Sequence, residues 1–202
     1  MRLLLIRHAV TAETGLTLSG RLPGIPLSAD GVVMAEELAT ELTAEPVRAL
    51  YSSPILRCRQ TAKPLGRTWG LTAGTVGSLT EADYGAWSGR KLSALYRLKA
   101  WQRLMGAASR FRFPEGETLE EVQRRSVSSV EELADEHGGV SVAVVSHADV
   151  IRVLIAHYLG MPLDLIHRLS VAPASLSIIE LHESGAAAVP VVNHGMAQGG
   201  RH

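Results

Sequence analysis

Two histidines that follow short apolar runs, together with nearby arginines, could bind and attack a phosphate group. The first run, Leu3–Ile6, is typical of a buried strand and ends in Arg7 and His8. An arginine guanidinium pairs with two phosphate oxygens at once, and a histidine nitrogen can attack phosphorus. Ligands bind at the carboxyl ends of strands in open α/β sheets. Arg7 and His8 are therefore candidate site residues, the alternative being a strand that merely ends in polar side chains.

A further arginine stands where a helix is expected to begin. Ser53 and Pro54 are typical of a helix start, because a serine hydroxyl caps free backbone N–H groups and proline fits the first helical position. We expect a helix from Pro54 to about Arg67, with Arg57 in its first turn. A cation at that end opposes the helix dipole unless an anion binds there. Arg57 is thus either a phosphate ligand or an ordinary solvated arginine.

The second histidine repeats the arrangement of the first. Val142–Ser146 is another strand-like apolar run, and it stops at His147 just before a helical pattern. A lone histidine is more often a structural residue than a catalytic one. Two strands that present His8 and His147 in the same topological position favour a shared site.

The segment around Glu81 carries a candidate proton donor. Glu81 and Asp83 lie among glycines and aromatic residues, which favour a shaped loop over a helix. Taken alone, this segment would be interpreted as a solvated acidic turn. Beside the other three segments, its carboxyl groups are candidates for acid–base chemistry.

Four motifs then occur in a recognisable order. They are Arg-His after an apolar strand, Ser-Pro-x-x-Arg-x-x-x-Thr-Ala, Glu-x-x-Tyr-Gly-x-Trp-x-Gly and Ser-His-x-x-x-Ile-Arg. Each motif is weak alone, but the ordered set resembles the histidine phosphatase superfamily in its phosphoglycerate-mutase-like branch. The resemblance extends from Met1 to about Val192, which is nearly the whole chain.

The resemblance implies a role for each candidate residue. His8 matches the nucleophile that becomes a phosphohistidine, and His147 matches the second histidine, which hydrogen-bonds the phosphoryl group. Arg7 and Arg57 match the phosphate-binding arginines. Glu81 matches the general acid that protonates the leaving oxygen and then acts as base on water. Such chemistry would need no metal ion or other cofactor.

Some positions match less securely or depart from the family pattern. Arg21 matches a family arginine near the pocket rim, and Thr14 stands about where a family asparagine often touches the phosphate. Ala148 and Asp149 replace a usual Gly-Gly pair. Asp149 could stabilise a protonated His147, but we expect it to cap the following helix.

The mechanism sets conditions on two protonation states. The attacking nitrogen of His8 must be neutral, with its other nitrogen bound to an acceptor, for which a backbone carbonyl is the expected group. Glu81 must be protonated in the first step, which requires a raised pKa. Tyr84 and Trp87 could supply the necessary burial.

The composition of the chain limits the classes of binding partner and the cellular compartment that we expect. The chain has 202 residues, 46% of them hydrophobic, and equal numbers of basic and acidic residues, 20 each. A zero net charge argues against nucleic acid or an anionic membrane as partner, and no apolar run approaches membrane-spanning length. The single cysteine, Cys58, excludes an internal disulfide and suits a reducing cytoplasm. A basic cluster over 97–112 could line a pocket, although we expect most of it to face water.

A metal site is not expected. His147, His157 and His167 recur every ten residues, but ten residues make about 2.8 helical turns, so one helix face would not hold all three.

The alternation of strand and helix patterns predicts a three-layer α/β/α sandwich with a mostly parallel central sheet. We expect one domain over 1–192 and a flexible tail over 193–202. In the first helix Val33, Leu38 and Leu42 are expected to face inward. The expected strands are 3–7, 47–52, 141–146, 175–181 and 187–192, and the expected helices are 29–42, 54–67, 91–105, 118–137 and 149–159.

These observations predict a cytoplasmic, metal-independent phosphomonoesterase that acts on a small phosphorylated metabolite. The alternative is a phosphoglycerate mutase, which returns the phosphoryl group to a substrate hydroxyl and must grip a second acidic group. The segment after Glu81 is acidic rather than basic, which favours hydrolysis. A phosphoprotein is a less favoured substrate class, and the chain could form a homodimer.

Overall fold

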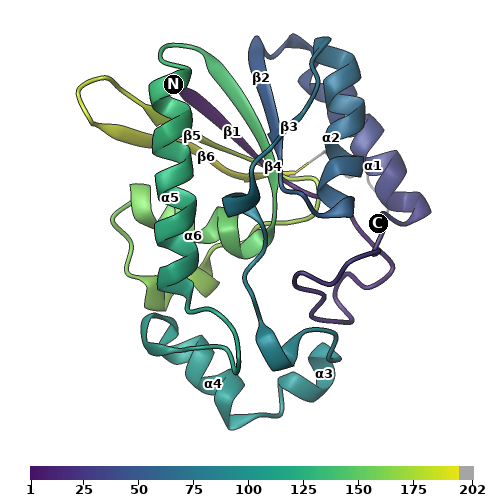
Figure 1. Cartoon of the computed structure of the whole chain (residues 1–202), viewed down its shortest axis with the longest axis vertical. Coiled ribbons are helices and arrows are strands. Elements are labelled where there is room, and N and C mark those ends of the chain that lie inside the picture. The colour runs from purple at the N-terminus through teal and green to yellow at the C-terminus, as the bar shows by residue number, and fades with distance from the viewer. Residues whose placement is uncertain (196–202) are drawn as a thin grey trace, which may run out of the picture.

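The computed structural model describes residues 1–195 and contains one six-stranded sheet (Figure 1). The strands are β1 (Arg2–Arg7), β2 (Val47–Ser52), β3 (Gly74–Thr75), β4 (Ser141–Ser146), β5 (Leu176–Leu181) and β6 (Ala187–His194). Their order in the sheet is β3-β2-β4-β1-β5-β6. The pairs from β3 to β1 are parallel, whereas β5 and β6 are antiparallel additions at one edge. The predicted mostly parallel sheet is confirmed.

Helices cover both faces of the sheet. They are α1 (Ala29–Glu41), α2 (Leu56–Trp69), α3 (Leu92–Leu95), α4 (Lys99–Gly106), α5 (Leu119–Glu136) and α6 (Ala148–Tyr158), with short 3-10 turns η1 (Leu42–Ala44), η2 (Gly77–Leu79), η3 (Gly85–Trp87), η4 (Ala108–Arg110) and η5 (Leu163–Arg168). Within residues 1–195, none of the helices combines the length and the apolar character needed to cross a membrane.

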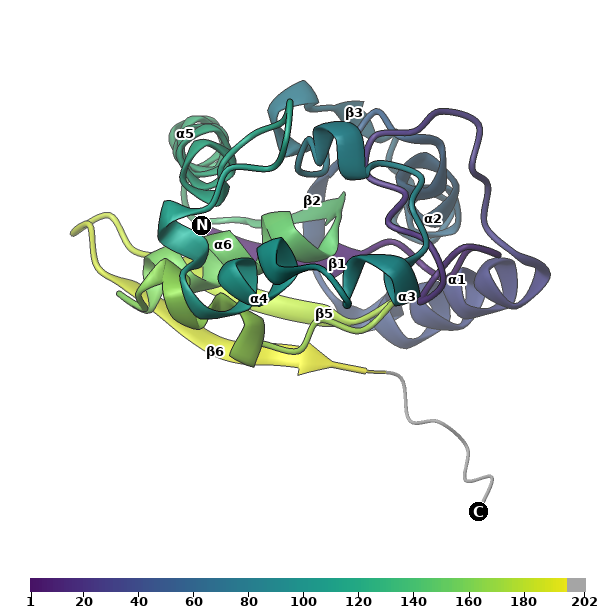
Figure 2. The same ribbon diagram turned by 90° about the horizontal axis from the view of Figure 1, so that it is seen from below.

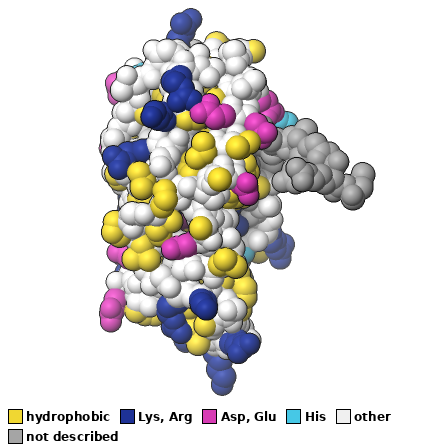
Figure 3. Space-filling view, turned by 90° about the vertical axis from the view of Figure 1, so that its right-hand side faces the viewer, with side chains coloured by type: hydrophobic (Ala, Val, Ile, Leu, Met, Phe, Trp, Pro, Cys, Tyr) yellow, Lys and Arg dark blue, Asp and Glu magenta, His cyan; other side chains and the backbone are white. Residues whose placement is uncertain are grey.

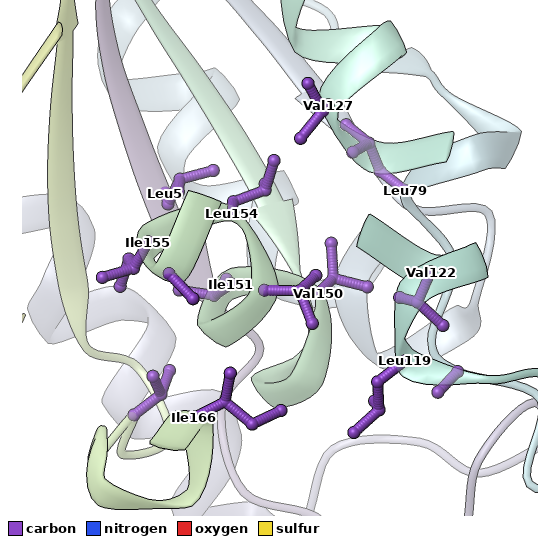
Figure 4. Close-up of a cluster of buried hydrophobic side chains, with 14 of the residues drawn as sticks. Leu5, Leu79, Leu119, Val122, Val127, Val150, Ile151, Leu154, Ile155 and Ile166 are labelled. Carbon is purple, nitrogen blue, oxygen red and sulfur yellow. The ribbon is translucent and has the colours of Figure 1, made fainter. Parts of the chain in front are cut away.

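Alternate residues of β1 enter two separate cores, as the period of two in a strand requires. Leu3 and Leu5 pack with α5 and α6, and Leu4 and Ile6 pack with α1 and α2. The close-up in Figure 4 shows Leu5 facing Leu154 and Ile155 of α6. The sheet therefore lies between two helical layers, and the expected three-layer sandwich is confirmed.

The start of α5 follows its sequence signal closely. Thr118 caps the backbone N–H of Glu121, and the Glu121 carboxylate accepts from the backbone N–H of Thr118. This capping box satisfies two backbone donors that would otherwise lack partners.

The predicted helix over 91–105 is wrong in one respect, because the structure divides it into α3 and α4. Leu95 and Leu104 are both buried. Nine residues correspond to a rotation of about 180° around a helix, so one straight helix could not bury both side chains in the same core. Figure 2 shows the two short helices in front of the strand ends when the molecule is seen from below.

Two smaller expectations also differ from the structure. Val33 is 55% exposed, because it lies about 140° around the helix from the buried Leu38. Strand β6 continues through Asn193 and His194, so the expected tail over 193–202 starts inside a strand. Residues 196–202 lie outside the described residues.

Candidate active site

The two predicted histidines meet where the carboxyl ends of two central strands lie side by side. Strands β1 and β4 are parallel neighbours, with Arg7 opposite Ser146, so His8 and His147 each follow the end of a strand. The backbone N–H of His8 donates to the Ser146 carbonyl over 3.0 Å. The two imidazole rings stand edge to face with centroids 5.3 Å apart.

His8 is held in one tautomer. Its Nδ1–H donates to the backbone carbonyl of Ala9 over 2.8 Å, and its Nε2 accepts from Nε of Arg57 over 3.1 Å. Burial, followed by the charges of Arg57 and Arg7, lowers the pKa of His8 to about 3. The ring is therefore neutral with its lone pair on Nε2, and the expected carbonyl acceptor is Ala9.

Arg57 lies in the first turn of α2, as predicted, and connects both histidines. Its Nη2 donates to the Gly20 carbonyl over 2.7 Å and to Nδ1 of His147 over 3.2 Å. The side chain is 3% exposed, and Nη1 is buried with no protein partner among residues 1–195. A buried guanidinium N–H without a partner is costly, and an oxyanion in the site would satisfy it.

Arg7 also has a buried N–H group without a partner. Its Nη1 donates to the Val171 carbonyl over 2.6 Å, which fixes the end of the side chain. Its Nε is buried and has no partner within the described part of the chain. Arg7 and Arg57 thus offer two unsatisfied N–H groups to a phosphate.

The expectation that Ser53 caps α2 is wrong. The helix begins at Leu56, and its N-cap is Ile55, whose side chain makes no capping hydrogen bond. Ser53 is instead buried against the second histidine, whose Nε2–H donates to the serine oxygen over 2.8 Å. The hydroxyl is used to orient His147 rather than to start the helix.

His147 is fully buried and neutral. Burial, followed by the neighbouring His8 and Arg57, holds the pKa of His147 well below its usual value. Cys58 lies beside this ring, with its sulfur 3.4 Å from Nε2. Burial raises the pKa of the Cys58 thiol, so this side chain is a buried, protonated thiol.

Glu81 lies in the loop after η2, and its carboxyl group is buried. Oε1 accepts from the backbone N–H of Ala82 over 3.0 Å. Burial and the nearby Asp149 raise the pKa of Glu81 to about 7. The raised pKa of Glu81 is what the proposed acid role requires. Of the two residues expected to bury the carboxyl group, Tyr84 lines the same pocket, whereas Trp87 packs in the core and does not line it.

Arg21 and Thr14 have different surroundings. Arg21 is not among the pocket-lining residues; it donates from Nε to the Glu81 carbonyl over 2.8 Å and from Nη2 to Glu117 over 2.8 Å. It therefore supports the backbone that carries the Glu81 carboxyl group. Thr14 does line the pocket, and its hydroxyl lies 3.1 Å from that of Thr11.

The expectation that Asp149 caps a helix is also wrong. His147 is the N-cap of α6, without a side-chain cap. Asp149 accepts from the Tyr84 hydroxyl over 2.8 Å and from Nη1 of Arg152 over 2.9 Å. Although burial opposes it, the partners Arg152 and Tyr84 lower the pKa of Asp149. Its carboxylate therefore remains charged near Glu81.

Sequence reasoning missed Arg152 and His167, which line the pocket together with the predicted residues. Arg152 was within the quoted Ser-His-x-x-x-Ile-Arg motif, and the i, i+3 spacing from Asp149 is one at which opposite charges pair on a helix. For His167 no sequence signal pointed to the pocket. The cavity that these groups surround has a volume of about 390 Å³.

These features bring two histidines, two incompletely paired arginines and a buried glutamate together at the carboxyl ends of parallel strands, which is the arrangement that the sequence resemblance implies. A comparison with protein families agrees, because residues 3–194 match the model of the histidine phosphatase superfamily, branch 1. The chain belongs to the histidine phosphatase superfamily.

The similar proteins include named phosphatases and a probable mutase. The chain is 30% identical to phosphoserine phosphatase 1 of Hydrogenobacter thermophilus, over 91% of this chain and 88% of that protein. It is 28% identical to a probable phosphoglycerate mutase of Yersinia pestis, over 91% of this chain and 86% of that one. Among solved structures, a mycobacterial glucosyl-3-phosphoglycerate phosphatase superposes with a TM-score of 0.87 at 25% identity, covering 96% of this chain and 99% of the other.

Proposed function

We propose that this enzyme hydrolyses phosphomonoesters of small metabolites, without a metal ion, through a phosphohistidine on His8. The observation that carries the proposal is the state of His8, a buried neutral imidazole with its lone pair on Nε2. Arg7 and Arg57 line the same pocket, and each has a buried N–H group without a partner among the described residues. An entering phosphate would draw Arg57 to its oxygens and leave Nε2 free to attack.

Two displacements at phosphorus complete the reaction. In the first, the lone pair of Nε2 forms a bond to phosphorus while the bond to the ester oxygen breaks, and protonated Glu81 gives its proton to that oxygen. In the second, the Glu81 carboxylate takes a proton from water, the water oxygen bonds to phosphorus, and the phosphorus–nitrogen bond breaks. Inorganic phosphate leaves, and His8 and Glu81 return to their starting states.

A pKa of about 7 suits Glu81 to both steps. An acid–base catalyst is most effective when its pKa lies near the working pH, because both protonation states are then populated. Arg7 and Arg57 supply the charge stabilisation that phosphoryl transfer demands.

Phosphoglycerate mutase activity is the second candidate, favoured by the 28% identity to the Yersinia pestis protein. A mutase must grip a second acidic group of its substrate. The loop after Glu81 contributes Asp83 rather than a cation, and none of the basic residues of 97–112 lines the pocket. Both observations support hydrolysis over transfer.

Phosphate release from a panel of phosphomonoesters, with chelator present, tests the proposal. Wild type should release phosphate and His8→Ala should not, while chelator changes neither result. Interconversion of phosphoglycerates without net phosphate release would instead establish the mutase.

A further inference from the structure

We propose that the leaving group of the natural substrate is uncharged and apolar, so that the substrate carries no carboxylate besides its phosphate. This rests on the proposed phosphatase function. Apolar side chains line the same pocket as Arg7 and Arg57 and are called its apolar wall. They are Leu18, Leu92, Tyr96, Trp101, Leu104, Met105 and Phe113.

The charges that line the pocket match one phosphate and leave no cation for a second anionic group. Three arginines line it: Arg7, Arg57 and Arg152. Asp149, 2.9 Å from Nη1 of Arg152, neutralises the third. A phosphate monoester carries a charge of about −1.5 to −2 near neutral pH, which Arg7 and Arg57 balance. His167 also lines the pocket, but burial lowers its pKa and favours the uncharged ring, so its Nε2, unpartnered within residues 1–195, offers a carboxylate a hydrogen bond and not a charge. A carboxylate on the substrate would thus be buried without a cation to pair with, which is unfavourable.

The basic cluster over 97–112 adds no cation to the pocket lining. Its members, Arg97, Lys99, Arg103, Arg110 and Arg112, are exposed and absent from the pocket lining. In the space-filling view, Lys and Arg side chains project at the lower end of the molecule, where α3 and α4 lie (Figure 3). These cations face solvent.

The hydroxyl groups on the remaining wall are largely engaged with protein atoms. Thr11 and Thr14 pair with each other over 3.1 Å, and Ser19 donates to Glu13 over 2.7 Å. They would gain little from a polyhydroxylated leaving group.

The apolar wall is a preformed surface. Tyr96 packs edge to face on Trp101 with ring centroids 4.9 Å apart, and Trp101 stacks on the buried Trp87 at 5.9 Å. Tyr96 is nevertheless 53% exposed and Met105 is 36% exposed. Because both side chains line the pocket, an apolar leaving group would cover apolar surface that is otherwise exposed to water.

The test compares primary alkyl monoesters, so that differences in leaving-group reactivity are small. We expect kcat/KM for benzyl phosphate to exceed that for phosphoserine, 3-phosphoglycerate and glycerol 3-phosphate by about tenfold or more. Trp101→Ala and Tyr96→Ala should each lower kcat/KM for benzyl phosphate about tenfold and leave that for glycerol 3-phosphate within about twofold. Val33→Ala, which removes an exposed apolar side chain on α1 outside the pocket, is the matched control and should change neither.

The outcomes separate the two proposals. Faster turnover of phosphoserine or 3-phosphoglycerate than of benzyl phosphate would overturn the apolar leaving group while leaving the phosphatase function intact. An equal loss on both esters in the Trp101 and Tyr96 variants would overturn it as well. Absence of phosphate release from every ester, with no phosphohistidine on His8, would overturn the function itself.

Discussion

The inner end of the pocket and its apolar wall are built in different ways. At the inner end, backbone carbonyls hold the side chains in place: Ala9 accepts from His8, Val171 from Arg7 and Gly20 from Arg57. The apolar wall comes largely from two short helices, α3 with Tyr96 directly after it and α4, and both Tyr96 and Met105 are exposed. Under the two proposals above, the chemistry would depend on side chains held by backbone hydrogen bonds, and the specificity would depend on the packing of the apolar wall.

The largest expected effect is at the nucleophile. His8→Ala should lower phosphate release by about 10³-fold or more and abolish phosphohistidine, because no other group can form the covalent intermediate. Phosphate release and mass spectrometry of the acid-labile adduct measure both. His157→Ala, at an exposed position on α6 outside the pocket, is the control and should retain full activity.

Glu81→Gln should separate leaving groups. Turnover of an alkyl phosphate should fall by about 10²- to 10⁴-fold, because the departing alkoxide then lacks a proton donor. Phosphorylation of His8 by p-nitrophenyl phosphate should fall far less, since that leaving group needs no proton. Single-turnover kinetics would show this difference, and an equal loss for both esters would refute the assignment of Glu81 as the acid.

Asp149→Asn should move the pH profile rather than abolish activity. The first step needs protonated Glu81, so kcat/KM for an alkyl ester should decline as the pH rises through about 7. Removing the Asp149 charge takes away one cause of the raised pKa and also leaves Arg152 uncompensated. Both changes favour the carboxylate, so the decline should shift to lower pH. An unchanged profile would mean that Asp149 has only a packing role.

The smallest effect should come from the scaffold. Thr118→Ala removes the capping box of α5 and should lower the free energy of unfolding by about 1 kcal/mol, with kcat/KM unchanged. Chemical denaturation measures the stability, and Thr40→Ala on the exposed surface of α1 should change it by less than about 0.5 kcal/mol. A loss of activity in Thr118→Ala without a loss of stability would show that scaffold and site are not separable.

Local patterns were enough to predict most of the sheet and its helices. Strands 47–52 and 141–146 have the bounds expected for them. In the second, residues 142–145 form a continuous apolar run and the whole strand is buried, as expected for a strand covered on both faces. The placement of His8 and His147 at the end of such runs also predicted that they would meet. These features follow from residues close together in the sequence.

Long-range contacts could not be predicted in the same way. The Tyr84 hydroxyl reaches Asp149 across 65 positions, and Ser53 contacts His147 across 94. Ser53 and Asp149 were both expected to cap a nearby helix, which is a local role. In the structure each makes a long-range hydrogen bond beside the site instead. The break between α3 and α4 likewise arises from packing rather than from a residue that stops helices.

The most direct test of the central proposal is a single turnover in water enriched in oxygen-18, quenched at intervals. Hydrolysis through His8 predicts that phosphohistidine forms and decays as phosphate appears, that the phosphate carries one heavy oxygen, and that the released alcohol carries none. Heavy oxygen in the alcohol, or phosphate formed without any phosphohistidine, would contradict it.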